Sequence, residues 1–174
     1  MSYLPKNRGL AALARPNALV YIKSVASQFG QDISGTLPVK VNFDTPEVYY
    51  GDWTPSITND IITLPQGYYY YIEQNQQIYM DQNFYNDADG TLQWYDEGNS
   101  TYIGTVGYFN KSNKVDALLE SGDQVAAAFI DATSASFTVS ARITSQYGWE
   151  YINAQQALYG YSGMGRQIIW RLDP

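Results

Sequence analysis

The stretch Ile61–Glu73, which reads IITLPQGYYYYIE, constrains the fold of this chain more than any other segment. A short β-branched run, Ile61–Leu64, is followed by Pro65–Gly67 and then by the aromatic run Tyr68–Ile72. Proline presets φ and glycine accepts a positive φ, so the Pro-x-Gly segment predicts a tight turn. β-branched and aromatic residues favour strands. The sequence therefore predicts two strands joined by a tight turn.

The second of these strands carries aromatic residues on both of its faces. Successive side chains alternate sides along a strand. One side carries Tyr69, Tyr71 and Glu73, and the other carries Tyr68, Tyr70 and Ile72. Such a strand is typical of a position between two packed layers or between two subunits.

The remaining chain predicts many short strands and little helix. Beyond the central pair, strands are expected at 18–25, 39–43, 91–95, 101–109, 124–130, 136–144 and 167–172, with an edge strand at 47–53. Short helical segments are expected at 114–120 and 149–158. Closely spaced strands with turn signals between them predict one all-β domain built as a sandwich or barrel.

Composition removes most catalytic chemistry. The chain contains no histidine and no cysteine, which excludes histidine-based triads, thiolate nucleophiles and disulfides. Gly160–Met164 has only a superficial likeness to a nucleophile elbow, and the loop acids of 87–97 favour turns. Counted from Asp87, a calcium loop would place Leu92 where glycine is needed and Gly98 where glutamate is needed. We therefore expect no enzyme, no catalytic residue, no cofactor and no metal site.

Charge is distributed unevenly along the chain, whose net charge is −7. Residues 1–31 carry four cations and no acid, whereas residues 41–110 carry ten acids and no Lys or Arg. The acidic body is expected to bind no nucleic acid, and no apolar run is long enough to span a membrane. Residues 1–17 are expected to form an arm that attaches to a partner, to the chain's own body or to a neighbouring copy. Its anchoring residues are Tyr3, Leu4, Lys6, Arg8, Leu10, Leu13 and Arg15.

Three short motifs carry a resemblance to a known superfamily. Val41–Asp44, Leu64–Tyr69 and Ser121–Val125 occur in an order and spacing similar to those of the complement globular-head and tumour-necrosis-factor-like jelly rolls. The resemblance implies a two-sheet antiparallel jelly-roll sandwich over residues 18–174 that assembles as a homotrimer. It also implies that the run Tyr68, Tyr69, Tyr70 and Tyr71 contributes to the trimer interface, with either Tyr69 and Tyr71 or Tyr68 and Tyr70 at the three-fold axis. Because the superfamily includes calcium-binding members, the resemblance also leaves open the possibility of an irregular calcium site formed by oxygen ligands.

Two questions about the chain stay open at this level. Residues 145–174 are either a C-terminal extension or contain the last strand of the jelly roll, at Gln167–Leu172. The aromatic residues near loops are either subunit contacts, which we favour, or a sugar-binding platform. The platform would consist of Tyr49, Tyr50, Trp53, Trp94 and Tyr95.

The basic arm, the long C-terminus and the absence of a signal sequence or stalk set the chain apart from secreted members of the superfamily. This layout resembles bacteriophage virion proteins, in which jelly-roll trimers decorate capsids or form fibre heads. We therefore expect a non-enzymatic capsid decoration protein, made in the host cytoplasm and anchored by its arm to the major capsid protein or another virion protein. The alternative is a receptor-binding or carbohydrate-binding head of a fibre or tail, with a cell-surface glycan as its ligand.

Overall fold

The computed structural model describes residues 16–24, 31–32, 36–43, 46–79, 88–111, 119–121, 125–147, 151–152, 155–156, 161–162 and 165–174. All regular elements in this part of the chain are strands. Most of them form two antiparallel sheets. The all-β antiparallel sandwich expected from the sequence is therefore confirmed.

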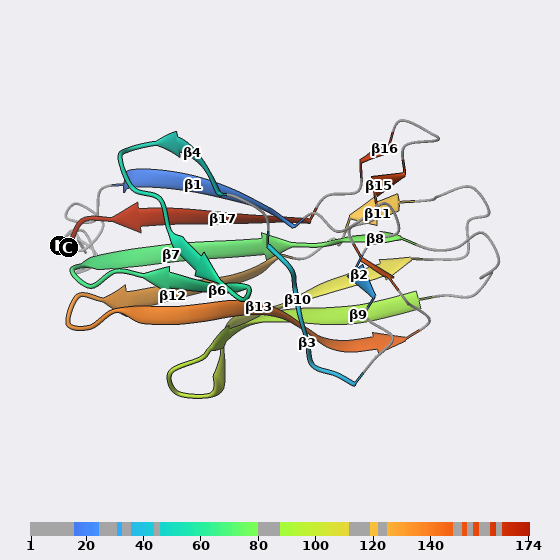
Figure 1. Ribbon diagram of the computed structural model, residues 1–174. Helices are drawn as coiled ribbons and strands as arrows, with labels where there is room; N and C mark the ends of the chain where they lie inside the picture. Colours follow the sequence, from blue (N-terminus) through green and yellow to red (C-terminus); the bar gives the residue numbers. More distant parts are fainter. Residues whose placement is uncertain are drawn as a thin grey trace, which may run out of the picture.

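The first sheet contains five strands that lie side by side (Figure 1). Their order is β12 (Ala126–Ala132), β7 (Tyr68–Asn75), β17 (Gly165–Leu172), β1 (Pro16–Ser24) and β4 (Pro46–Tyr50). Every neighbouring pair is antiparallel. The edge strand expected at 47–53 is present as β4, and the first strand begins at Pro16 rather than at Ala18.

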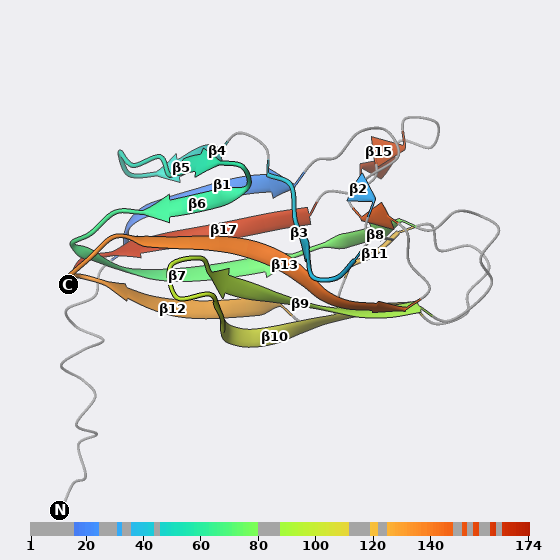
Figure 2. The ribbon, with the colours of Figure 1, turned by 60° about the horizontal axis from the view of Figure 1, so that its bottom comes forward.

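The second sheet runs alongside the first (Figure 2). Its order is β10 (Thr101–Lys111), β9 (Ala88–Asp96), β13 (Phe137–Tyr147), β6 (Ile61–Leu64) and β5 (Ser56–Thr58), and β3 (Val39–Lys40) also pairs with β13. A smaller sheet contains β11 (Leu119–Ser121), β8 (Gln77–Tyr79), β14 (Tyr151–Ile152) and β2 (Gln31–Asp32). β15 (Gln155–Gln156) pairs with β16 (Tyr161–Ser162). The helix predicted at 149–158 is wrong, because β14 and β15 lie in that segment. Of the helix predicted at 114–120, only Leu119 and Glu120 are among the described residues, and they belong to β11.

The last strand decides the open question about the C-terminus. β17 lies between β7 and β1 in the middle of the first sheet, not beside the domain. It pairs over its whole length with β1 and over seven residues with β7. Of the two alternatives, the structure therefore supports the second, in which the segment Gln167–Leu172 belongs to the last strand of the jelly roll, β17.

Alternation of side chains supplies the core between the two sheets. Nearly every second residue of β1, β7, β12 and β17 is buried, and so are the facing residues of β6, β9 and β13. The largest fully buried side chains are Trp94, Tyr70, Ile22, Ile62, Leu64, Ile72, Leu92 and Ile143. Trp94 donates its indole N–H to the carbonyl of Ala126 at 3.2 Å, which satisfies its one polar group inside the core.

Strand β10 covers one edge of the first sheet. Between Ile103 and Gly107 its pairing with β9 shifts, which marks a bulge. There the Thr105 hydroxyl accepts the N–H of Ala127 at 2.9 Å and donates to the Ala127 carbonyl at 3.3 Å. Gly104 has φ = +73° and lies directly against the same backbone, so a Cβ at this position would overlap the Ala127 carbonyl oxygen. The bulge thus provides hydrogen-bond partners for the backbone N–H and carbonyl of Ala127, which would otherwise be unpaired on the edge strand β12.

Replacing Gly104 with alanine should therefore destabilise the protein strongly, by about 3 kcal/mol, because the added methyl group displaces β10 from β12. Gly67→Ala is the matched control. Gly67 also has a positive φ, of +103°, but no heavy atom lies within 4 Å of its Cβ position. The control should cost only the backbone term, about 1–2 kcal/mol. Urea unfolding of both variants measures the difference, and equal losses would contradict this account of the bulge.

Candidate functional site

A continuous row of large apolar side chains crosses the outer face of the first sheet. Paired residues of neighbouring strands point to the same side of a sheet. Phe129 pairs with Tyr71, Tyr71 with Trp170, Trp170 with Leu19, and Leu19 with Tyr50. This aromatic row, defined by these five residues, spans all five strands from β12 to β4.

Neighbouring aromatic rings widen the row into a patch. Tyr71 and Trp170 have ring centroids 5.5 Å apart, and Tyr69 stacks on Phe129 at 5.6 Å. At the other edge Tyr21 meets Tyr49 edge to face at 5.8 Å. Phe129 is 61% exposed and Tyr49 is 66% exposed. A contiguous exposed patch of this kind marks an interaction surface in soluble proteins.

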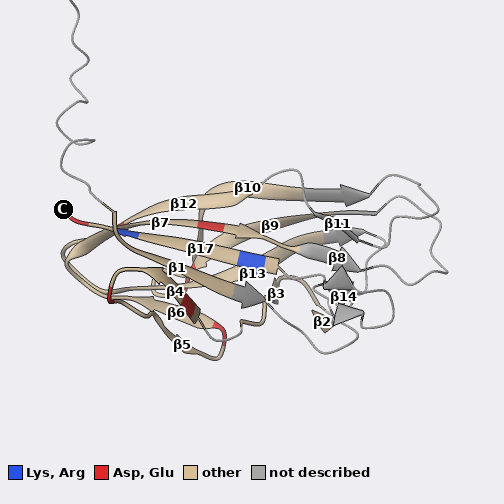
Figure 3. Ribbon diagram, turned by 90° about the horizontal axis from the view of Figure 1, so that it is seen from above, with Lys and Arg blue, Asp and Glu red and all other residues tan. Residues whose placement is uncertain are grey.

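Charged residues are few along the described parts of β12, β7, β17 and β1, as the colours of the ribbon in Figure 3 show. Glu73 lies beside the row and accepts a hydrogen bond from the Tyr71 hydroxyl at 2.9 Å. That hydrogen bond, together with burial and the negative charge of Glu73, raises the pKa of Tyr71. Asp131 lies at the end of β12, where hydrogen bonds from the hydroxyl and the N–H of Thr133 lower its pKa.

The tyrosine run divides between the two faces of β7. Tyr69 and Tyr71 lie on the outer face, as alternation predicts. Tyr70 is fully buried and donates its hydroxyl to the Pro65 carbonyl at 2.9 Å, and burial raises its pKa to about 12. Tyr68 packs against the core beside Tyr70. The assignment of Tyr68 and Tyr70 to an interface is therefore corrected, because both side chains pack inward.

The five residues expected to form a sugar platform do not share a surface. Trp94 is fully buried in the core, and Trp53 is only 8% exposed. Tyr49 and Tyr50 are exposed on β4 of the first sheet, whereas Tyr95 lies in β9 of the second. Tryptophans near predicted loops were thus mistaken for surface residues. The platform as predicted is not assembled by this fold.

The predicted arm residues Tyr3, Leu4, Lys6, Arg8, Leu10, Leu13 and Arg15 lie outside the described residues. The arm's predicted end at residue 17 is corrected, because Pro16 and Asn17 already belong to β1. The side-chain oxygen of Asn17 accepts a hydrogen bond from Arg171 Nε at 2.6 Å, and its amide donates to Asp173. Arg171 also pairs with Asp52 at 3.2 Å and lies over the Tyr68 ring, 4.5 Å from its centroid. These contacts tie the first residues of β1 to the end of β17.

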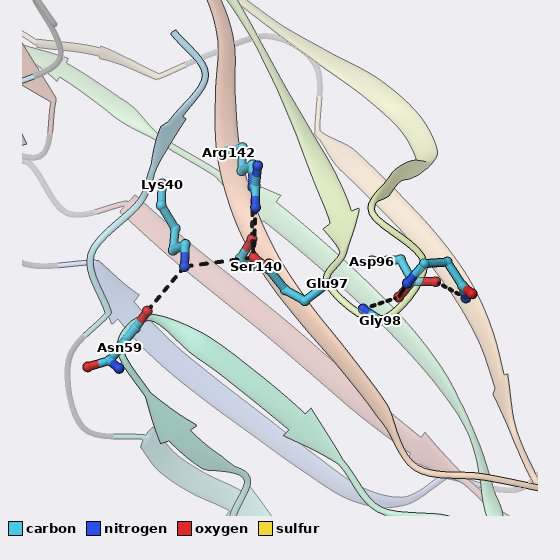
Figure 4. A network of polar contacts seen from close by, with 8 residues as sticks. Lys40, Asn59, Asp96, Glu97, Gly98, Ser140 and Arg142 are labelled. Carbon is cyan, nitrogen blue, oxygen red and sulfur yellow. Dashed lines mark hydrogen bonds and ion pairs between the residues drawn. The ribbon is translucent and has the colours of Figure 1, made fainter. Parts of the chain in front are cut away.

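The outer face of the second sheet carries a self-contained polar network (Figure 4). Glu97 accepts hydrogen bonds from Ser140 at 2.6 Å and Arg142 at 2.9 Å, and Lys40 lies 3.8 Å away. The guanidinium of Arg142 lies 3.5 Å from the centre of the Tyr95 ring. Burial alone would raise the pKa of Glu97, but these hydrogen bonds and cations outweigh it and lower the pKa. The charged groups satisfy one another, which indicates a structural role.

Other site types receive no support from the described residues. In this part of the chain, no group of three or more acidic residues is arranged to hold a metal ion. Within the same residues, no helix is long and apolar enough to span a membrane.

Comparison with solved structures supports a tumour-necrosis-factor-like jelly roll. The fold is similar to the crystal structure of murine APRIL, with a TM-score of 0.51 and 8% sequence identity. The match covers 88% of this chain and 98% of that chain. At this identity the likeness concerns the fold alone. No protein-family model and no curated protein matches the sequence.

The network around Glu97 predicts a pH-dependent loss of stability in Arg142→Met. A carboxyl whose pKa falls on folding stabilises the folded state above its unfolded pKa, and this stabilisation is lost as pH falls through the folded pKa. The variant should therefore lose about 1 kcal/mol near neutral pH, and the loss should shrink below about pH 4. Lys40→Met, which removes the longer 3.8 Å pair, should lose less. Chemical unfolding of the wild type and both variants between neutral pH and about pH 4 measures these losses. A loss of stability in Arg142→Met that does not depend on pH would contradict an electrostatic role for Arg142.

Proposed function

We propose that this chain is a non-enzymatic structural protein that assembles as a homotrimer through the outer aromatic face of its first sheet. The observation that carries this proposal is the aromatic row from Phe129 to Tyr50, which crosses every strand of that sheet. The three-fold symmetry is supported by the resemblance of Val41–Asp44, Leu64–Tyr69 and Ser121–Val125 to the superfamily of jelly-roll trimers.

The physical argument for assembly is the cost of leaving this face in water. Burying apolar surface contributes roughly 25 cal/mol per Å², and each aromatic side chain offers a large area. Tyrosine suits a subunit boundary because its ring is buried while its hydroxyl keeps a polar partner. The hydrogen bond from Tyr71 to Glu73 is an example of such an arrangement. Charged residues make up only 16% of the chain, so little charge opposes contact.

A non-enzymatic role is supported by the missing catalytic groups. Without histidine or cysteine, acid–base or nucleophilic chemistry would depend on carboxylates, lysine or hydroxyl groups. Among the described acids, Glu97 is engaged by Ser140 and Arg142, and Asp96 accepts the backbone N–H groups of Gly98 and Asn99. These contacts suit structural roles better than catalytic ones.

The location we propose is the surface of a bacteriophage capsid, with the major capsid protein or another virion protein as partner. The basic residues 1–15 support this, because they contrast with the acidic body and precede the first strand of a complete sheet. Pro16 pairs with Leu172, so the arm begins at the end of the sheet beside the C-terminus. The carbohydrate-binding alternative has less support, because the five aromatic residues predicted to form its platform do not share a surface.

Phe129→Asp should disperse the trimer. This side chain is 61% exposed on β12, so the substitution leaves the core intact while placing a charge at one end of the aromatic row. Tyr102→Asp is the matched control, because Tyr102 is 39% exposed in β10 of the second sheet. Sedimentation velocity should give three times the chain mass for the wild type and the control. It should give a monomer for Phe129→Asp, with an unchanged far-ultraviolet spectrum. A trimer in all three proteins would exclude this face as the interface.

Removing residues 1–15 should leave a folded trimer that no longer attaches to particles. The cut stops before Pro16 and Asn17 because Asn17 binds Arg171 and Asp173. Truncated and full-length protein are added to particles that lack it, and the bound fraction is measured after pelleting. Replacing Lys6, Arg8 and Arg15 with glutamine in the full-length chain separates the arm's charge from its length. Full attachment of the truncated protein would contradict an anchoring role.

A further inference from the structure

The two edge strands of the first sheet differ in how they are covered. At the edge formed by β12, the bulge of β10 provides hydrogen-bond partners for the backbone of Ala127. At the opposite edge β4 pairs with β1, and no described strand pairs with the other side of β4. An edge strand in this state presents backbone N–H and C=O groups to which a further segment of chain can bind.

The core side of β4 is also incompletely covered. Val48 pairs with Val20, whose side chain is fully buried, so Val48 lies on the side of the sheet that faces the core. It is nevertheless 40% exposed. The connection from β4 to β5 buries Trp53 and Pro55 but leaves Val48 accessible. A segment that runs along the open edge of β4 would therefore gain apolar contact as well as backbone hydrogen bonds.

The charge of this edge limits what can cover it. The charged residues of segment 46–64 are all acidic: Glu47, Asp52 and Asp60. Asp52 pairs with Arg171, whose side chain is only 11% exposed, whereas the side chain of Asp52 is 95% exposed. A segment that suits this edge therefore carries cations and apolar residues rather than acids.

Residues 1–15 have this composition and lead into the fold at the right place. They contain Lys6, Arg8, Leu10, Leu13 and Arg15 and no acid. They precede Pro16 of β1, the strand beside β4, and Gly51 at the end of β4 lies against the backbone of Asn17 and Ala18. Fifteen extended residues span up to about 50 Å, and the five residues of β4 span about 17 Å. The segment is therefore long enough to cross the end of β4 and follow its open edge.

We propose that in the unattached protein residues 1–15 fold back along the open edge of β4 of the same chain, with their leucines against Val48 and their cations near Glu47 and Asp52. This inference rests on the proposed anchoring function of the arm and adds how the arm is held before it attaches. An arm bound to β4 is not available to a particle. The apparent affinity for the particle is therefore reduced by the fraction of arms that are free.

Hydrogen exchange of the full chain, measured by mass spectrometry without particles, tests the proposal. The amides of residues 6–14 should exchange at least about tenfold more slowly than in an unstructured peptide. Val48→Lys should return them to the unstructured rate, because it places a cation on the edge that the basic arm covers. Val106→Lys is the matched control, because Val106 is 49% exposed in β10 of the second sheet. It should keep the wild-type protection.

Two further measurements guard against a loss of folding in the variant. The amides of β7, in the interior of the first sheet, should exchange equally in the wild type and both lysine variants. Replacing Lys6, Arg8 and Arg15 with glutamine leaves the body unchanged and should remove most of the protection of residues 6–14. Val48→Lys should also bind particles more tightly, by about the factor by which the wild-type arm is protected.

Each failure has its own signature. Unstructured exchange of residues 6–14 in the wild type overturns the docking. Protection that survives Val48→Lys assigns the arm to another surface and overturns the role of β4. Protection that disappears on dilution to a monomer assigns the arm to a neighbouring copy and overturns docking within one chain. The anchoring function fails separately, if protein without residues 1–15 still attaches to particles, because exchange of the unattached protein does not involve particles.

Discussion

The register between β7 and its two neighbours is the constraint on which the rest of the structure depends. Because side chains alternate along a strand, a slip of one residue would exchange the buried and exposed tyrosines. Two hydrogen bonds at the turn before β7 fix this register. Gly67 donates its N–H to the Ala132 carbonyl at the start of the pairing with β12, and Tyr70 reaches back to the Pro65 carbonyl. With that register, Tyr70 and Ile72 enter the core, and Tyr69 and Tyr71 join Phe129 and Trp170 outside.

The two outer faces of the sandwich differ in how their polar groups are paired. On the second sheet, Glu97, Ser140, Arg142 and Lys40 satisfy one another within the chain, and Arg142 covers the ring of Tyr95. On the first sheet, a row of aromatic side chains and Leu19 extends from edge to edge, and Glu73 accepts a hydrogen bond from the Tyr71 hydroxyl. A network that is complete within one chain suits a face that stays in water. A row of large apolar side chains that no described part of the chain covers suits a face that another copy covers.

Sequence reasoning predicted the architecture better than the surface. The all-β sandwich, the Pro-x-Gly turn and the two-sided alternation of the tyrosine run followed from local chemistry, and each is present in the structure. Which side of β7 faces the core depends on its pairing with β12 and β17, far away in the sequence, so Tyr68 and Tyr70 were assigned to the wrong environment. Trp94 was expected at the surface because turn signals flank the short strand predicted at 91–95, yet it fills the core. Phe129 and Trp170 were missed because they join Tyr71 only after the strands pair, although Phe129 stands out in the alternating segment Ala126–Ala132.

The central claim is that the outer aromatic face of the first sheet is buried between copies of this chain. Hydroxyl-radical footprinting of the wild-type protein tests it most directly, because it reports the exposure of individual side chains in solution. The account predicts that Phe129, Tyr71 and Trp170 are protected at concentrations where the protein is assembled and become labelled on dilution. Tyr102, on the opposite face, should be labelled equally in both conditions. Equal labelling of Phe129 and Trp170 in the concentrated and dilute samples would contradict the claim.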